Sequence, residues 1–295
     1  MQNTQGTKIF KVFNYILLTV IACIMLFPYL NTLAKALSDA NAAGTVYLWP
    51  KNFTWVNFKT IMGDATLWPA VKITLLRMMF GVPFTLILRF TCGYALSRKF
   101  IGKNFFVFFY MLPTFISAGQ IPYYVLLSKT GLINNFLLYV FVGGFSFFDA
   151  IIIKTFIQST IPEGLHESAT LDGANEAQIM FKIVLPLCKP ILATVMLWTM
   201  VEHWNDWTTT LYYMRSQSLY TLAYKMMELI KESEKISQML IQAQLAGQST
   251  ENIQRPSSES LIAAQVIITT LPIICVYPFL QKYFVKGIMI GSVKG

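Results

Sequence analysis

Long apolar segments separated by short polar connections make up most of the chain. Such segments occupy residues 13–33, 68–96, 105–127, 136–157, 190–207 and 261–283. A helix of about 20 mostly apolar residues is long enough to cross the hydrocarbon core of a bilayer. The pattern therefore predicts an all-α, polytopic membrane protein with six transmembrane helices. The fourth segment is the cleanest of the six, whereas Pro113, Gly119 and Pro122 interrupt the third.

The polar connections predict how the chain is divided. Residues 1–67 are expected to hold the first span and an external loop, and residues 68–295 a core with the five other spans. Within this core we expect three extramembrane parts: a cytoplasmic loop at 160–190, an external segment at 208–260 and a cytoplasmic tail at 284–295.

The external segment 208–260 has two kinds of pattern. Apolar residues recur there at near-helical spacing between charged ones, which predicts a helix, at Met226, Ile230, Ile236 and Leu240. The polar run 246–260 that follows is typical of a loop. Two interpretations are open: an amphipathic cap packed on the bundle, and a docking surface for an external protein.

Composition and charge agree with a location in the bilayer. The chain is 55% hydrophobic and 13% charged, whereas an ordinary globular domain is about 45–50% apolar and about 25% charged. The net charge of +9 comes from Lys and Arg scattered through short loops, which favours an orientation signal over a nucleic-acid site. Positive charge is denser in the loops on the side of both termini, most clearly at Arg98, Lys99 and Lys103, so this side is predicted to be cytoplasmic.

The loop at 160–190 is polar but patterned like a helix, a turn and a second helix. Pro162 suits the first turn of a helix, and Glu163 and Glu167 lie near its positive N-terminal end. The pair Asp172-Gly173 marks a turn at the end of this helix, because glycine adopts positive φ at little cost.

A second helix is predicted beyond the turn. Asn175 can cap its N-terminus, and Pro186 is expected to end it. A short helix held by a tight turn on the cytoplasmic side would be a rigid projection. A partner that pushed this projection would displace the spans on either side.

The sequence ESATLDGANEAQIMFKIVLPLCKP, residues 167–190, closely resembles the EAA loop of permease subunits of binding-protein-dependent ABC importers. That family has a Glu-Ala-Ala start, then Asp-Gly-Ala, then Ile-x-Leu-Pro. The matching residues are Glu167, Ala169, Asp172, Gly173, Ala174, Ile183, Leu185 and Pro186, and Ser168 replaces the usual second alanine. WNDW at 204–207 and the C-terminal YPFLQKYFVKGIMIGSVKG resemble the carbohydrate branch of the family, so the resemblance covers most of the chain after residue 68.

This resemblance implies a fold and a division of labour. The fold would be that of a type I ABC importer permease in the bacterial cytoplasmic membrane. The chain would form half of a translocation path with a second permease subunit and receive cargo from an extracytoplasmic sugar-binding protein. The expected cargo is an oligosaccharide or polysaccharide fragment, with a non-sugar solute as the alternative.

The resemblance also implies that the loop is a coupling element. It would seat on a dimer of separate cytoplasmic ATPases through Glu163, Glu167, Ser168, Ala169, Asp172, Gly173 and Ala174. Glu167 would meet ATPase side chains, Gly173 would make the turn, and Asp172 would hold the turn by hydrogen bonds. The sequence contains no GxxxxGK[ST] motif, so ATP and Mg are expected on the ATPase, and this chain is expected to have no cofactor of its own.

Several charged residues lie inside predicted spans, where they usually face the bundle interior or a cavity. Arg89 and Asp149 both lie about 13 Å from the cytoplasmic ends of their spans, at about 1.5 Å of rise per residue. We therefore expect these two side chains to pair or to share a polar network. Arg77 and Glu202 likewise lie at matching depths in their spans, nearer the outer side of the membrane, so they are a second expected pair.

Candidate sugar contacts combine aromatic faces with amide or acidic partners. The residues of this kind near the outer ends of the spans are Gln120, Tyr124, Trp204, Asn205 and Asp206. For Trp207 we favour a position in the aromatic belt at the membrane interface.

Catalytic and metal sites are not expected. The group Glu202, His203 and Asp206 has a single histidine, which argues against a metal site, and the four cysteines lack CxxC spacing. The rival class, an intramembrane enzyme, would need converging titratable groups at catalytic spacing. Asp149, Glu202 and His203 form no recognisable set of that kind, so the chain is not expected to be an enzyme.

Overall fold

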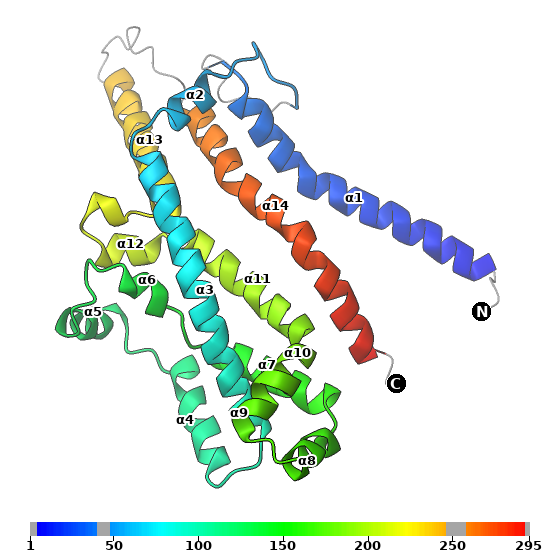
Figure 1. Ribbon diagram of the computed structural model, residues 1–295. Coiled ribbons are helices and arrows are strands. Elements are labelled where there is room, and N and C mark those ends of the chain that lie inside the picture. The colour runs from blue at the N-terminus through cyan, green and yellow to red at the C-terminus, as the bar shows by residue number, and fades with distance from the viewer. Residues whose placement is uncertain (1–4, 40–47, 246–257, 293–295) are drawn as a thin grey trace. The chain divides into compact units, whose positions relative to one another are not determined.

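The computed structural model describes residues 5–39, 48–245 and 258–292, and the regular elements within these ranges are helices (Figure 1). The chain forms two compact units. One comprises Met1–Leu67 and Met226–Leu271, and the other comprises Trp68–Lys225 and Pro272–Gly295.

The first unit holds α1 (Gln5–Ala36), α2 (Val56–Met62), most of α13 (Leu222–Leu245) and the start of α14 (Ser258–Ser292). Asn57 ties α2 to the end of α1, because its side-chain amide donates to the carbonyls of Ala36 and Ser38, at 2.9 Å each. Lys35 pairs with Glu259 at 3.2 Å. The apolar side chains of α1 from Phe10 to Leu30 are largely exposed, as expected of a helix that faces lipid.

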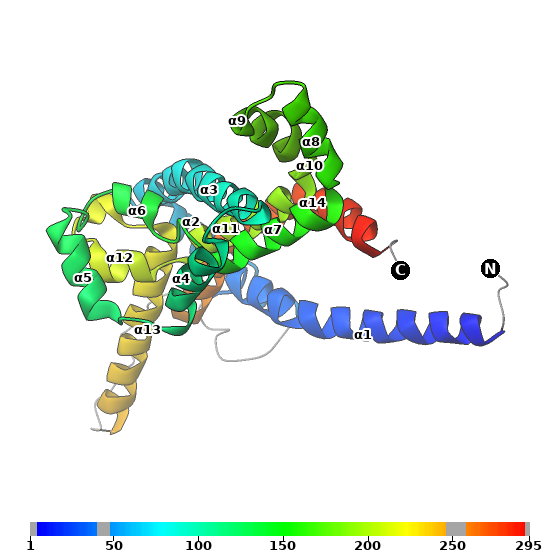
Figure 2. The same ribbon diagram turned by 90° about the horizontal axis from the view of Figure 1, so that it is seen from below.

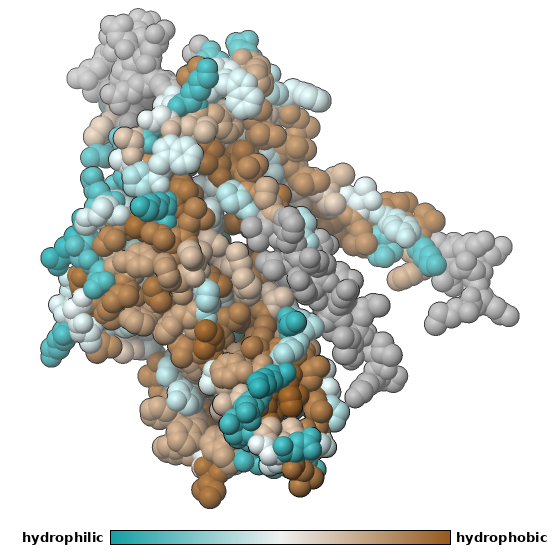
Figure 3. All heavy atoms as spheres, in the orientation of Figure 1, coloured by the Kyte–Doolittle hydropathy of each residue, from teal (hydrophilic) through white to brown (hydrophobic). Residues whose placement is uncertain are grey.

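The second unit holds α3 to α12, and the residue bounds of its elements follow. They are α3 (Leu67–Ser97), α4 (Lys103–Phe115), α5 (Gln120–Lys129), α6 (Leu137–Phe141), α7 (Phe147–Thr160), α8 (Glu163–Leu171), α9 (Glu176–Gln178), η2 (Ile179–Val184), α10 (Leu185–Leu187), α11 (Lys189–Asn205), α12 (Thr208–Tyr213) and η3 (Gln217–Leu219). The helices α8 and α9 project from one end of this unit in both views (Figures 1 and 2). Hydrophilic side chains gather over α8 and α9, whereas apolar side chains cover α4 (Figure 3).

The predicted spans differ in regularity. Within the described residues, two single helices are long and apolar enough to cross a membrane, Phe10–Ala36 and Leu67–Ser97. They correspond to the predicted spans 13–33 and 68–96. Two further candidates are bent pairs: α4 with α5 at 114°, and Glu176–Leu187 with α11 at 80°.

The fourth apolar segment, 136–157, is not one regular helix as its composition suggested. It is broken between α6, which ends at Phe141, and α7, which begins at Phe147. Gly143 has φ +70°, and Ser146 caps α7 by accepting the N–H of Asp149 at 3.3 Å. A glycine at positive φ and a serine cap end and restart a helix whatever its hydropathy.

The remaining predictions for the helical parts are mixed. The helix expected in the 208–260 segment is present as α13, while residues 246–257 lie outside the described residues. The predicted tail at 284–295 continues α14 as helix to Ser292. Gly93 allows α3 to approach α7 closely, since a Cβ there would lie 2.7 Å from the Ile153 side chain.

Candidate functional site

The helix α8 ends in a tightly bonded turn that its sequence explains. Gly173 has φ +84°, and its N–H donates to the carbonyl of Thr170 at 3.0 Å. The N–H of Ala174 donates to the carbonyl of Ala169 at 3.0 Å. These two bonds define a Schellman motif, and Ala174 packs against the apolar core to which Ala169 belongs.

The chain re-enters a helix one residue after this motif. Asn175 and Gln178 form a capping box: the Asn175 side chain accepts the N–H of Gln178 at 2.9 Å, and the Gln178 side chain accepts the N–H of Asn175 at 3.0 Å. The turn between the two helices is therefore fixed from both sides. We call residues 163–187 the elbow.

The second helix of the elbow does not stop at Pro186 as the sequence suggested. It passes through the π-helical segment η2 into α10, which contains Pro186, and reaches Leu187. The N–H of Leu185 bonds to the carbonyl of Met180, five residues earlier. The wider π-helical turn ends directly before Pro186, a residue that has no N–H to donate. The backbone therefore continues as a helix past Pro186 and does not stop there.

The inner side of the elbow is bonded to the end of α3. The hydroxyl of Tyr94 donates to one carboxylate oxygen of Glu176 at 2.5 Å, and His166 Nε2 lies 2.9 Å from the other. The Tyr94 hydrogen bond is the main reason that the pKa of Glu176 is lowered below its usual value. Lys99, just beyond α3, pairs with Glu163 at 2.8 Å, and this pairing lowers the pKa of Glu163.

The elbow also shares its apolar core with the predicted spans. The buried members of this core come from five elements: Phe90 and Tyr94 of α3, Ile153 and Ile157 of α7, Ala169 of α8, Ile179 and Val184 of η2, and Cys188, Leu192 and Val195 at α11. Because close-packed interiors transmit displacement, a movement of α8 is expected to displace α3, α7 and α11 as well.

The outer side of α8 is free of such contacts in the described part of the chain. Glu167 and Ser168 are exposed, and the apolar side chain of Leu171 is 89% exposed. The Asp172 carboxylate makes no hydrogen bond within the turn, as far as the described residues go. The role expected for Asp172 is therefore wrong in its detail, because main-chain bonds of the Schellman motif already close the turn.

Arg89 forms a buried polar network, in which the structure brings Arg89 and Asp149 together. The guanidinium group is 2% exposed and forms an ion pair with Asp149. It also donates to the hydroxyl of Thr199 at 3.0 Å and to the carbonyl of Gly143 at 2.8 Å. Glu202 lies 3.3 Å away as a second, more exposed carboxylate.

The contact to Gly143 explains how the break between α6 and α7 is tolerated. A carbonyl released from a helix at membrane depth needs another donor. Arg89 of α3 supplies it, while also binding Asp149 in the first turn of α7 and Thr199 of α11. One side chain thus joins three elements of this unit.

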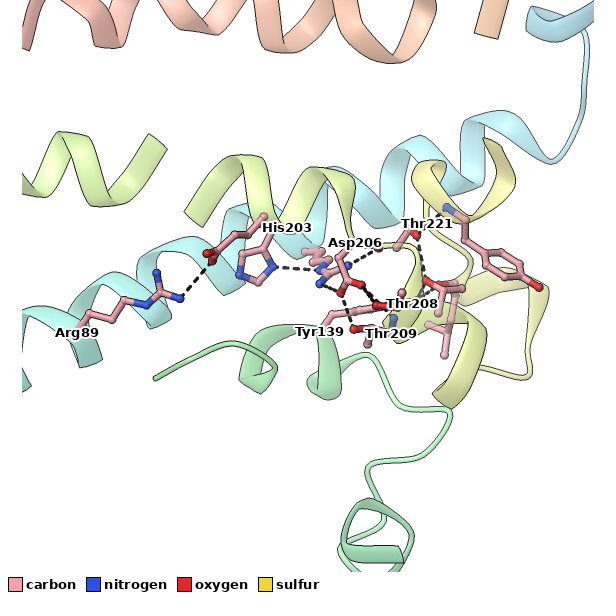
Figure 4. A network of polar contacts seen from close by, with 12 residues as sticks. Arg89, Tyr139, His203, Asp206, Thr208, Thr209 and Thr221 are labelled. Carbon is pink, nitrogen blue, oxygen red and sulfur yellow. Dashed lines mark hydrogen bonds and ion pairs between the residues drawn. The ribbon is translucent and has the colours of Figure 1, made fainter. Parts of the chain in front are cut away.

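Arg77 forms a second network with a partner other than the expected Glu202. Its guanidinium group binds Asp206 at 2.5 Å and the Nδ1 atom of His203 at 3.1 Å, and it lies 4.9 Å from the centre of the Tyr139 ring. Thr209 donates to Asp206 from its hydroxyl and its N–H. Figure 4 shows Tyr139, His203, Asp206 and Thr209 converging there.

The expected Arg77–Glu202 pair is wrong, and the error is one of depth. Glu202 and Asp206 are four residues apart at the end of α11, so they lie on the same side of the helix, about one turn apart. Glu202 lies beside Arg89, which leaves Asp206 for Arg77. His203 is buried within this network, and no cluster of three or more His, Cys, Asp or Glu that could hold a metal occurs in the described residues.

The candidate sugar contacts lie in different surroundings. Trp204 is 8% exposed and lines an apolar cavity with Leu75 and Leu197. Tyr124 stacks on Tyr213 with ring centres 6.2 Å apart, and its hydroxyl accepts from Arg215 at 3.0 Å. Gln120 and Asn205 are exposed at the start of α5 and the end of α11.

Reasoning from sequence missed several residues of the site. The link from Tyr94 to Glu176 joins residues far apart in the chain, and the link from His166 to Glu176 crosses the turn of the elbow. No local motif announces either link. Tyr139 was missed for the same reason, although a tyrosine inside an apolar run signals a hydroxyl that needs a partner. Its hydroxyl donates to the carbonyl of Leu219 at 2.7 Å.

The family to which the chain belongs follows from comparison with known proteins. Residues 81–290 match the family described as "Binding-protein-dependent transport system inner membrane component". This range runs from the middle of α3 to the last turns of α14 and contains the elbow and the network centred on Arg89. The chain belongs to this family of transport components, and it is a permease subunit and not an enzyme.

Individual relatives agree over almost the whole chain. Protein LplC of Bacillus subtilis (strain 168) is 30% identical over 300 residues, covering 100% of this chain and 98% of LplC. The polygalacturonan/rhamnogalacturonan transport system permease protein YtcP of the same organism is 27% identical and covers 98% of this chain and 99% of YtcP.

A solved structure is also similar. One chain of a bacterial ABC transporter involved in the import of the acidic polysaccharide alginate superposes with a TM-score of 0.79 at 27% identity, covering 96% of this chain and 99% of that chain. The all-helical fold is therefore that of a type I ABC importer permease.

Proposed function

We propose that this chain is one of two permease subunits of an ATP-driven importer of oligosaccharides or polysaccharide fragments, and that α8 is its coupling helix. One observation carries the proposal: α8 exposes Glu167, Ser168 and Leu171 on one side, while Ala169 on the other side packs in the core of the spans. Such a helix can dock on a second protein and pass its movement inward.

The proposed mechanism is a population shift between outward-open and inward-open arrangements. A separate cytoplasmic ATPase dimer would bind ATP and Mg and close, and α8 would follow the closing surface. ATP can drive this change only if it binds the closed ATPase arrangement more tightly than the open one. In this chain, the contacts of Glu176 and Glu163 with α3 would carry the displacement to the spans.

The membrane arrangement is part of the proposal. It has six spans, with α4–α5, α6–α7 and α11 contributing broken or bent ones, in the bacterial cytoplasmic membrane. Both termini and the elbow face the cytoplasm. The partners are a second permease subunit, the ATPase dimer and an extracytoplasmic sugar-binding protein.

The proposed cargo rests on relatives whose names state sugar transport, such as YtcP and the melibiose/raffinose/stachyose import permease protein MelC of Bacillus subtilis (strain 168). Tyr124, Gln120 and Asn205 are the residues we propose for the sugar path. Asp206 is bound by Arg77 and Thr209, and Trp204 is buried, so in this arrangement both are held by protein contacts. A non-sugar solute is the alternative cargo.

The test is to purify the tagged chain with its natural partners and measure ATP hydrolysis in lipid. The expected result is copurification of an ATPase and a second permease, and stimulation by binding protein plus an oligosaccharide. Glu167→Lys should abolish the stimulation without loss of membrane insertion, while the charge reversal Lys129→Glu on the exposed end of α5 serves as control. Normal uptake by Glu167→Lys would contradict the role of α8, and stimulation by peptides or osmolytes alone would contradict the cargo.

A further inference from the structure

A cavity lies beneath the elbow, at the ends of three predicted spans. Its volume is ≈ 310 Å³, and its lining comes from the end of α3, the start of α4, α7, α8 and η2. The polar residues that matter here are Arg98, Lys99, Lys103, Gln158, Glu163 and His166. No role in coupling assigned above uses the space itself.

The charge of this cavity is unbalanced. It is lined by three cationic side chains, of which Lys99 has a carboxylate partner, Glu163. Among the described residues, no ion pair joins Arg98 or Lys103 to a carboxylate, and the Lys103 ammonium group instead donates to the carbonyl of Arg98 at 3.1 Å. Desolvation and the nearby charges of Lys154 and Lys99 lower the pKa of Lys103, as expected where cations repel one another.

The start of α4 adds to this positive potential. Gly102, with φ +82°, is its N-cap and offers no side chain to the first N–H groups. The N-terminus of a helix attracts anions through its free N–H groups and its dipole. Since α4 begins at Lys103, this end of the helix lies at the rim of the cationic cavity.

A second feature of residues 98–103, which connect α3 to α4, favours a lipid as the anion that binds here. An apolar groove of ≈ 470 Å³ lies along α3 and α4, lined by Leu88, Ala95, Leu96, Phe100 and Phe106 among others. Phe100 lines this groove, while Arg98, Lys99 and Lys103 line the cationic cavity. Next to Phe100, the side chain of Ile101 is fully exposed, at 101%. Residues 98–103 thus border both a site for an anion and a site for hydrocarbon.

We propose that the cationic cavity binds the phosphate of an anionic phospholipid headgroup, with an acyl chain along the apolar groove. Basic pockets between transmembrane helices at the membrane surface are suited to such headgroups. A free phosphate would use the same cations but not the groove. An acidic side chain of an ATPase would also not need the groove. The proposal requires only that the chain is inserted in a membrane and does not depend on the cargo.

The bound lipid would lie beside the Lys99–Glu163 pair, which links the end of α3 to α8. A phosphate in the cavity would compete with Glu163 for Lys99 and would screen the repulsion around Lys103. The composition of the membrane would thereby change how firmly the elbow is held.

The test uses the assembled transporter in nanodiscs of phosphatidylcholine that contain increasing fractions of phosphatidylglycerol. After the complex is released from the nanodiscs, native mass spectrometry measures how much phosphatidylglycerol it retains. The double variant Arg98→Gln/Lys103→Gln should bind phosphatidylglycerol about thirty-fold more weakly than the unmodified protein, from the loss of two charges near the membrane surface. The control Lys72→Gln/Lys129→Gln removes the same charge from exposed positions and should bind as the unmodified protein does.

Three outcomes would overturn the proposal. Equal retention of phosphatidylglycerol by the double variant and the control would show that the cavity does not hold the lipid, including the case in which an ATPase side chain fills it. Displacement of the lipid by millimolar inorganic phosphate would identify a free-phosphate site. If the double variant fails to assemble, hydrogen exchange is measured on the unmodified complex instead. The amides of residues 98–106 should exchange more slowly in phosphatidylglycerol than in phosphatidylcholine. Equal exchange in the two lipids would refute the proposal.

Discussion

The elbow and the network around Arg89 hold their elements together in opposite ways. The elbow is built from bonds between residues close in sequence, such as Gly173 to Thr170 and Asn175 to Gln178, and one of its faces is exposed. The Arg89 network joins residues far apart in sequence and is buried. The difference teaches that the elbow can move as a rigid part, because its own turn is closed by local bonds. The bundle of spans, by contrast, depends on long-range polar contacts such as those of Arg89.

This comparison predicts that substitutions in the network reduce stability, whereas substitutions in the elbow change coupling and leave the bundle folded. Four experiments test this division, from the largest expected effect to the smallest.

Arg89→Leu should have the largest effect. It leaves the Asp149 carboxylate and the Gly143 carbonyl buried without their donor, and breaking a buried pair by removing one partner costs about 3–5 kcal/mol. Thermal unfolding of the purified protein should show the loss, and Arg89→Lys should recover part of it by restoring the charge. Unchanged stability of Arg89→Leu would mean that the network does not support the bundle.

Gly173→Ala should weaken coupling without loss of folding. A side chain at φ +84° costs about 1–2 kcal/mol, and this cost falls on the turn of the elbow alone. Stimulated ATP hydrolysis should fall by up to about ten-fold. Gly164→Ala is the matched control, because a Cβ at that helical position meets open space. A drop of equal size in both variants would contradict the importance of the turn.

The contacts of Glu176 should make the attachment of the elbow to α3 sensitive to acid. The pKa of Glu176 is lower in the folded protein than its ordinary value of 4.5, chiefly through the hydrogen bond from Tyr94, so the stabilisation of the elbow by Glu176 is present above that value. The contribution is lost as the pH falls through the lowered pKa. The protection of amides in residues 163–184, corrected for the pH dependence of intrinsic exchange, should therefore fall below about pH 4.5, and Glu176→Gln should make this loss smaller. A loss of equal size in Glu176→Gln would assign the effect to another group.

Asp172→Asn should have the smallest effect on the fold. The carboxylate makes no hydrogen bond within the turn in the described part of the chain, so the stability of the elbow should change by less than about 0.5 kcal/mol. Hydrogen exchange at Gly173 and Ala174 checks this. Faster exchange at these two amides would show that the Asp172 side chain does hold the turn.

The same contrast explains how much could be predicted from the sequence. The positions of α8, its glycine turn and the Asn175 cap were predictable, because caps and turns depend on a few adjacent residues. The break at Gly143 was missed, since hydropathy reports burial in lipid and not the backbone path. The pairing of Arg89 with Asp149 followed from depth alone, but the depth read from apolar runs was too coarse to tell Glu202 from Asp206, about one turn further along, as the partner of Arg77. The continuation of the elbow through Pro186 depended on π-helical bonding that local rules do not foresee.

The central claim is that the outer face of α8 docks on the ATPase, and crosslinking from Leu171 tests it most directly. A photoreactive residue at position 171 is placed in the intact transporter, with Tyr212, an exposed residue on α12, as the control position. The account predicts a crosslink from position 171 to the ATPase, changed in yield by ATP, and none from position 212. A complex that hydrolyses ATP normally but gives no crosslink between position 171 and the ATPase would contradict it.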